Sequence, residues 1–406
     1  MKNNSFRFLW IGQSLANFGD VFYIVGLIST LYSVSESVFY LALLPFINTF
    51  GRFLSGFISP VLFNKYKLKT LLVGSQIGKT IVLLGLASWV SLQSIPSIWV
   101  LIVFILVIAF LDGWAMPATG AMLPRVVDKQ EIVKANSFVS VIDQTIQLGG
   151  WALGGIIVAL IGGKYVIWVT FCLFVVSSIM ISRIVDSTPF HVKDENANLG
   201  GVLKGSWKII WNSSLFRSLH VVFFIEAIAN VVWIAAIIYV FVSEVLEKSE
   251  SWWGYINTTF FIGLLIGGVF CSKYFSIVER HLKKIMIATS FGVSIITFMY
   301  GLNSVAWMAL VFSVLFGIVE QVKSIAYDTY IQLEATPEEL PKLYGAQSAL
   351  ISLTFGLSSL MMGAIAEIFG VRYVFLLAGF LLASAAIYLT VNKNCFPENY
   401  QDVSDD

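Results

Sequence analysis

Long apolar stretches alternate with short polar ones along the whole chain. Each stretch is long enough to cross a hydrocarbon core of roughly 30 Å as a helix. Helices are the expected element, because a backbone surrounded by lipid must satisfy its hydrogen bonds within its own segment. The pattern predicts twelve spanning helices, near residues 8–32, 38–63, 69–92, 99–123, 138–161, 165–185, 218–243, 253–275, 284–302, 305–330, 346–369 and 372–392.

Composition strengthens this interpretation. Of the 406 residues, 58% are hydrophobic and only 12% are charged. A water-soluble fold of this length cannot bury so much apolar surface. The expected fold class is therefore all-α: a polytopic membrane protein with twelve transmembrane helices in two pseudo-repeated six-helix bundles. Residues 1–7 precede the first span without a small-residue cleavage site, which favours a retained helix over a removed signal peptide.

Basic residues indicate the orientation, since Lys and Arg are retained in cytoplasmic loops. The loops on one side carry most of them, whereas the opposite loops carry only Lys164, Lys248 and Arg372. This asymmetry predicts cytoplasmic termini and a multi-pass location in the cell membrane. The net charge of +1 gives no reason to expect a nucleic-acid partner.

The longest polar interval divides the chain into two halves. We expect an N-terminal six-helix bundle over residues 1–187, a cytoplasmic linker over 188–217, a C-terminal six-helix bundle over 218–393 and a cytoplasmic tail over 394–406. Within the linker, apolar residues from Val202 to Trp211 recur at helical spacing and alternate with lysines. This pattern favours an amphipathic helix on the inner membrane surface.

Short matches between the halves indicate a duplication. The segment after the fourth predicted helix aligns with the segment after the tenth, and the same offset places Asp112 over Glu320. Gly51 likewise lies over Gly263. Duplicated halves are the arrangement expected when a binding site lies between repeats.

Ionisable residues inside the apolar spans are the most informative candidates. Each costs at least ~2.5–3.5 kcal/mol at a helix centre and persists mainly where it is used or paired. A buried carboxyl group can bind and release a proton near neutral pH, which is what a proton-coupled exchanger requires. The candidates for proton coupling are Asp20, Asp112, Glu226 and Glu320, and the sequence does not rank them.

These acids have a structural alternative, which is to neutralise buried cations. Glu320 and Lys323 are three residues apart and share a helix face. Arg52 and Lys79 also need acidic partners, and either Asp143 or Asp20 could serve. The candidates for structural charge pairs are Arg52, Lys79, Asp143 and Lys323.

Several short motifs stand in or near the first, fourth and fifth predicted helices. They are Asn17-Phe18-Gly19-Asp20, Pro117-Ala118, Leu123-Pro124 and Ala135-Asn136-Ser137. These motifs resemble the major facilitator superfamily, most closely its drug-efflux branch with the macrolide-efflux proteins. The resemblance covers nearly the whole chain and implies a drug/proton antiporter that works as a monomer by alternating access.

The superfamily's cytoplasmic signature after the second helix is similar to a short stretch of this chain. Gly56 is followed by Asn64, Lys65, Lys67 and Lys69. The resemblance implies a gating loop that includes Gly56, Asn64, Lys65 and Lys69. Asn64 stands where the superfamily normally has an acidic residue, so the usual gating ion pair is missing.

The resemblance also implies that the first, fourth, seventh and tenth helices line a central cavity. Mid-span aromatic and amide side chains on these helices are candidates for binding substrate: Phe18, Tyr23, Trp114, Trp233, Asn230 and Tyr327. Aromatic faces beside carboxylates suit an amphipathic and often cationic ligand. Packing against lipid is the alternative for each aromatic residue.

Two patterns suggest other chemistry but lack its context. Gly74 to Thr80 reads GSQIGKT, yet this stretch is one residue shorter than a phosphate-binding loop and lies inside a predicted helix. The three histidines and three cysteines are dispersed along the chain. We therefore expect no ATP hydrolysis, no metal site and no cofactor.

The expected function is secondary active transport, with proton-driven efflux of small amphipathic molecules that are macrolide-like or multidrug substrates. The first alternative keeps the fold but imports its substrate, or moves a lipid or a siderophore. The second is a membrane-embedded sensor or enzyme, for which the sequence offers no recognisable pairing of nucleophile and base. The expected partners are the small substrate, protons and the lipid bilayer.

Overall fold

Every regular element among the residues that the structure describes is a helix. This computed structural model describes residues 3–35, 38–93, 97–186, 188, 199–233 and 235–397. Within these residues, ten helical segments are long and apolar enough to cross a membrane. Two further helices, α2 (Val38–Lys65) and α6 (Ile132–Ile161), have 28 and 30 residues and reach well beyond the roughly 20 that a span needs. The all-α, polytopic fold predicted from hydropathy is confirmed.

The remaining helices of the predicted spans follow the apolar pattern closely. Their bounds are α1 Asn4–Ser35, α3 Leu68–Leu92, α4 Ile98–Gly113, α5 Ala115–Val126, α7 Gly163–Ser182, α9 Ser214–Ala229, α10 Ala235–Glu244, α11 Glu250–Lys273, α13 Leu282–Leu302, α14 Ala306–Glu334, α15 Leu340–Phe369 and α16 Val371–Val391. Short 3-10 turns are η1 Lys129–Glu131, η2 Asn230–Trp233 and η3 Lys393–Cys395.

Two spans predicted as single helices are interrupted. The fourth divides at Trp114 into α4 and α5. Pro117 explains this break, because proline has no N–H to donate to the carbonyl of Gly113 and its ring crowds that carbonyl. The seventh divides at η2 between α9 and α10, where the backbone N–H of Asn230 still donates to the Glu226 carbonyl.

Two helices lie between spans. The linker contains α8 (Leu199–Asn212), which spans the stretch from Val202 to Trp211. Its location on the inner membrane surface stays a prediction. A single-turn helix, α12 (Phe275–Arg280), joins α11 to α13. The first part of the predicted linker, residues 189–198, and the tail beyond residue 397 are outside the described residues.

The chain forms two compact units by its internal contacts. Unit 1 comprises Met1–Lys129, Thr145–Trp207 and Ala335–Ala349, and unit 2 comprises Gln130–Gln144, Lys208–Glu334 and Leu350–Asp406. Each unit is mainly one half of the chain. The start of α6 belongs to unit 2, and the start of α15 belongs to unit 1.

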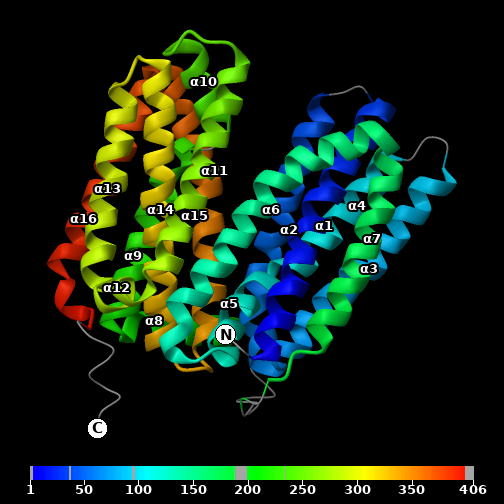
Figure 1. The fold of residues 1–406 in the computed structure, drawn as a ribbon, viewed down its shortest axis with the longest axis horizontal. Helices are drawn as coiled ribbons and strands as arrows, with labels where there is room; N and C mark the ends of the chain where they lie inside the picture. The colour runs from blue at the N-terminus through cyan, green and yellow to red at the C-terminus, as the bar shows by residue number, and fades with distance from the viewer. Residues whose placement is uncertain are drawn as a thin grey trace. The chain divides into compact units, whose positions relative to one another are not determined.

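The same helix pairs recur in both units (Figure 1). In unit 1, α1 packs against α7, α2 against α4, and α3 against both α4 and α7. In unit 2, α9 packs against α16, α11 against α14, and α13 against both α14 and α16. Counted as spans within each half, these pairs are identical, which confirms the predicted duplication.

Glycines allow two of these helix pairs to approach closely. A Cβ atom at Gly317 of α14 would lie 2.9 Å from the backbone nitrogen of Leu264 in α11 and would also meet the carbonyl oxygen of Phe260. In unit 1, a Cβ at Gly51 of α2 would lie 2.8 Å from the Cβ of Ala109 in α4. Small residues at such positions let two helix backbones approach.

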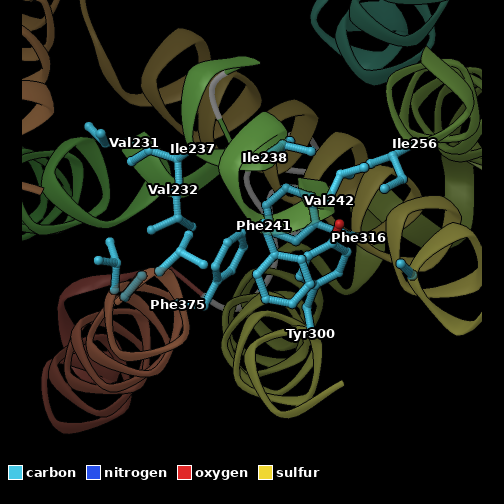
Figure 2. Close-up of a cluster of buried hydrophobic side chains, with 14 of the residues drawn as sticks. Val231, Val232, Ile237, Ile238, Phe241, Val242, Ile256, Tyr300, Phe316 and Phe375 are labelled. Atoms are coloured by element: carbon cyan, nitrogen blue, oxygen red, sulfur yellow. The ribbon is translucent and has the colours of Figure 1, made fainter. Parts of the chain in front are cut away.

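Unit 2 is built around a cluster of buried aromatic and aliphatic side chains from α10, α13, α14 and α16 (Figure 2). Phe241, Tyr300 and Phe375 have ring centroids about 5.0 Å apart from one another. Phe316 lies beside them and is 2% exposed. The centre of this unit is therefore filled by packed rings.

We predict that Gly317→Val lowers the thermal unfolding temperature of the detergent-purified protein. Overpacking against the α11 backbone costs about 1–3 kcal/mol, and the rigid backbone leaves little room for relaxation. The matched control is Gly356→Ala in α15, where an added Cβ meets nothing within 4 Å. Equal unfolding temperatures for Gly317→Val and the parent would contradict this account of the α11 and α14 contact.

Candidate functional site

Four charged side chains from four helices meet inside unit 1. The Lys79 ammonium lies 2.9 Å from Oδ2 of Asp20 and 2.8 Å from Oδ1 of Asp112, and it donates a hydrogen bond to each. Arg52 completes the group, with Nη2 2.8 Å from Oδ2 of Asp112. We call these four residues the Lys79 cluster.

The local sequence of α3 directs Lys79 inward. Ser75, Gln76, Lys79 and Leu83 recur at helical spacing and all are buried. The ammonium also lies 5.0 Å from the centre of the Phe174 ring of α7, a favourable contact between a cation and an aromatic face. Only 1% of the Lys79 side chain is exposed, so its two carboxylate partners replace the water that it has lost.

A second cluster lies inside unit 2. The Lys323 ammonium of α14 lies 2.8 Å from Oε2 of Glu320 and 3.1 Å from Oε1 of Glu226 of α9. These are ion-pair distances, although the angles at the ammonium and at Glu320 Oε2 fall outside those of a hydrogen bond. Tyr327 donates its hydroxyl proton to Oε1 of Glu226 over 3.0 Å. We call these four residues the Lys323 cluster.

The two clusters differ in their balance of charge. When fully ionised, the Lys79 cluster has two cations and two carboxylates and is neutral. The Lys323 cluster has one ammonium and two carboxylates, and therefore carries one surplus negative charge. Only 8% of the Glu226 side chain and 22% of the Glu320 side chain are exposed, so solvent screens this surplus poorly.

Three of the predicted substrate residues lie beside the Lys79 cluster or its helices. Tyr23 is buried, and its hydroxyl accepts a hydrogen bond from Nδ2 of Asn48 at 3.1 Å. Trp114 stands at the break between α4 and α5, and its indole N–H donates to the Leu71 carbonyl. The Phe18 ring is 4.4 Å from that of Phe22 on the same helix.

The other three lie in unit 2 and are mostly engaged in packing. Trp233 stacks on Phe316 at 3.9 Å and donates to the Thr297 hydroxyl, which makes it part of the ring cluster described above. Tyr327 belongs to the Lys323 cluster. Asn230 ends α9, and its Oδ1 is buried without a hydrogen bond to any described residue.

The predicted gating residues and Asp143 differ in their exposure and in the helices that carry them. Gly56 faces Ala349 of α15, whose atoms an added Cβ would meet at 3.8 Å. Asn64 is 7% exposed, whereas Lys65 is exposed and Lys69 is half-buried. Asp143 lies on α6 in the part that belongs to unit 2, and its predicted role in a structural charge pair stays a prediction.

One buried ion pair of unit 1 was not predicted. Nη1 of Arg125, at the end of α5, lies 3.1 Å from Oδ2 of Asp186, which follows α7. Nη2 of Arg125 donates to the Pro337 carbonyl at 2.6 Å. Arg125 and Asp186 are 61 residues apart, so no helical spacing in the sequence could have paired them.

The structure also locates the two sequence patterns that suggested other chemistry. Gly74 to Thr80 lies within α3, and the lysine of this stretch is the centre of the Lys79 cluster. A phosphate loop needs consecutive free backbone N–H groups, which a continuous helix does not offer. Within the described part of the chain, no group of three or more His, Cys, Asp or Glu side chains is arranged to hold a metal ion.

Comparison with known families matches nearly the whole chain. The family model described as Major Facilitator Superfamily matches residues 9–276 and 227–396. Among curated relatives, the chain is 29% identical over 382 residues to the uncharacterized MFS-type transporter YfmI of Bacillus subtilis (strain 168), covering 93% of each chain. It is 20% identical over 296 residues to the multidrug efflux pump Tap of Mycolicibacterium fortuitum, covering 69% of each chain.

Solved structures share the fold at low identity. The human organic anion transporter MFSD10 (TETRAN) aligns with a TM-score of 0.77 at 10% identity, covering 95% of this chain and 99% of that one. A bacterial homologue of the iron transporter ferroportin in the outward-facing state aligns with a TM-score of 0.73 at 15% identity, covering 96% and 99%. Together with the repeated helix pairs and the family match across both halves, these likenesses lead to one conclusion: the chain belongs to the major facilitator superfamily.

Proposed function

We propose that this superfamily transporter exports amphipathic small molecules, macrolide-like or multidrug, in exchange for protons and by alternating access. It works as a monomer in the cell membrane with both termini in the cytoplasm, and neither nucleic acid nor a bound cofactor takes part. Similarity to the multidrug efflux pump Tap supports the substrate class. The strong bias of Lys and Arg to one set of loops supports the orientation.

The observation that carries proton coupling is the surplus carboxylate of the Lys323 cluster. Lys323 neutralises one of two acids, and the second is left charged at a largely buried position. One proton bound to Glu226 or Glu320 makes the cluster neutral and removes that cost. A group of this kind can be loaded with a proton on one side of the membrane and unloaded on the other.

The Lys79 cluster suits a different role. Its charges already balance, so a proton added to Asp20 or Asp112 would leave a buried cation without its counter-ion. Its ion pairs connect α1, α2, α3 and α4. We therefore propose Glu226 and Glu320 as the proton carriers, with Asp20 and Asp112 as structural partners of Lys79.

We predict that Lys79→Met destabilises the protein, because it leaves Asp20 and Asp112 facing each other with only Arg52 to compensate. Breaking a buried pair from one side costs on the order of 3–5 kcal/mol. Thermal unfolding in detergent measures the effect. The double variant Lys79→Met, Asp20→Asn removes one charge of each sign and should recover part of the loss, whereas a double variant as unstable as the single one contradicts the counter-ion role.

We predict that adding substrate to the purified protein releases roughly one proton between pH 6 and 8, because substrate and proton compete for one form of the transporter. Macrolides, lipophilic cations and dyes form the screen. Release should vanish in Glu226→Gln or Glu320→Gln and persist in Asp20→Asn. Glu244→Gln, at an exposed acid that ends α10, is the matched control. Binding without proton release in the parent would remove the basis for antiport.

Direction of transport is tested separately in everted membrane vesicles. If the protein exports its substrate from the cell, everted vesicles with an acidic lumen should accumulate a substrate found in the screen. A protonophore should abolish this accumulation. Accumulation in right-side-out vesicles instead would favour the importer alternative, which uses the same fold and the same acids.

A further inference from the structure

Arg52 differs from the rest of the Lys79 cluster in its exposure. It lies near the middle of α2, yet 40% of its side chain is exposed. The corresponding values for Asp20, Asp112 and Lys79 are 15%, 8% and 1%. The guanidinium is therefore the most accessible charged group of the cluster.

Arg52 lies on the side of α2 opposite to its exposed apolar stripe. Phe50, Leu54 and Ile58 form an exposed apolar stripe at intervals of four residues, as expected for a face in contact with lipid. Arg52 is two residues from Phe50 and from Leu54, and two residues are more than half a turn of an α-helix. A charged group in mid-span is unstable toward lipid, and the guanidinium accordingly lies on the other side of α2 from the apolar stripe.

Most of the hydrogen-bonding capacity of Arg52 is unused. Among the described residues its only ion-pair partner is Asp112, reached through Nη2. The Nε–H is buried and donates to no described residue. A guanidinium presents N–H groups in a planar fork that matches a carboxylate, sulfonate or phosphate. Among the described residues, Nη1 of Arg52 has no ion-pair partner.

Neutralising Asp112 does not by itself explain a half-exposed arginine. Asp112 already receives a hydrogen bond from Lys79 at 2.8 Å. Asn48, one turn before Arg52, donates its amide to the Tyr23 hydroxyl, so a polar group borders the guanidinium on the same face of α2. An arginine beside neutral polar groups such as Asn48 and Tyr23 is suited to bind a second anion.

We infer that Arg52 binds the anionic group of the transported molecule, and that the substrates include amphipathic organic acids. This inference rests on the proposed transport of amphipathic small molecules and adds acidic compounds to the proposed substrates. The acid group of the ligand lies against Nη1 of Arg52, while Asp112 retains Nη2. Its apolar part extends away from the cluster.

The test is calorimetric binding to the full-length protein in phosphatidylcholine nanodiscs at pH 7. The probes are matched pairs of an acid and its neutral amide: 4-phenylbutyrate with 4-phenylbutyramide, and 2-naphthylacetate with 2-naphthylacetamide. We expect each acid to bind at least about tenfold more tightly than its amide, as charge-assisted hydrogen bonds to a guanidinium allow. Discs that contain phosphatidylglycerol should give the same preference, because a lipid headgroup does not reach mid-span.

The decisive variant pair separates ligand binding from charge balance. Arg52→Gln alone removes the anion site but also leaves Asp112 with less compensation. The double variant Arg52→Gln, Asp112→Asn loses one charge of each sign and keeps the cluster neutral, so it should unfold near the temperature of the parent. We expect the preference for acids to be lost in both variants and to be weaker in Arg52→Lys, which keeps the charge without the fork.

Three results would overturn the inference: equal affinity for acids and amides, no binding by any acid, or a preference for acids that survives in the double variant. None of these depends on proton release or on the direction of transport. Failure of this inference is therefore distinguishable from failure of the proposed proton-coupled export, which the Glu226 and Glu320 variants test.

Discussion

The structure depends above all on the cost of placing charge where water is scarce. A lysine in mid-span is tolerable only if acids from neighbouring helices replace its hydration. Lys79 meets this condition with carboxylates from α1 and α4, whereas Lys323 uses one carboxylate from α9 and one from its own helix. Each lysine thereby fixes the helices that supply its partners, and the ion pairs act as specific connections within bundles that are otherwise held by apolar packing.

Close helix packing and charge pairing support each other in unit 1. Gly51 precedes Arg52, and Gly113 follows Asp112. A Cβ at Gly113 would lie 2.9 Å from the carbonyl oxygen of Arg52, so only glycine lets α2 and α4 come this close. The approach of the two backbones brings the guanidinium within 2.8 Å of the carboxylate. Helix packing therefore sets the geometry of the cluster.

Local features of the sequence predicted much of this architecture. Apolar stretches predicted the spans. Pro117 explains the break in the fourth span, which was expected to be a single helix. The break near Asn230 carries no proline or glycine, so nothing local announced it. Likewise, Glu320 and Lys323 could be paired from their spacing, whereas Lys79 is 59 and 33 residues from its partners, and their contact depends on how α1, α3 and α4 pack.

Aromatic residues show the same limit. The sequence pattern around a mid-span Trp is the same whether the side chain lines a cavity or fills a core. Only tertiary packing distinguishes the two. Trp233 stacks on Phe316 within the ring cluster of unit 2. Trp114 instead uses its indole N–H to bond a backbone carbonyl of α3 beside a helix break. Neither outcome could be deduced from the position of the residue in its apolar stretch.

The hydroxyl groups beside Glu226 form a short hydrogen-bonded chain. Its donor-to-acceptor direction depends on the charge of that carboxylate. Tyr327 has a single hydroxyl proton and uses it to donate a hydrogen bond to Glu226. The Ser290 hydroxyl lies 3.1 Å from the Tyr327 oxygen and 2.8 Å from the Met286 carbonyl oxygen. If Glu226 becomes the donor, Tyr327 accepts from it and can donate to Ser290, whose hydroxyl donates to the Met286 carbonyl of its own helix. The ionisation state of Glu226 on α9 thus sets the direction of hydrogen bonds that reach α13.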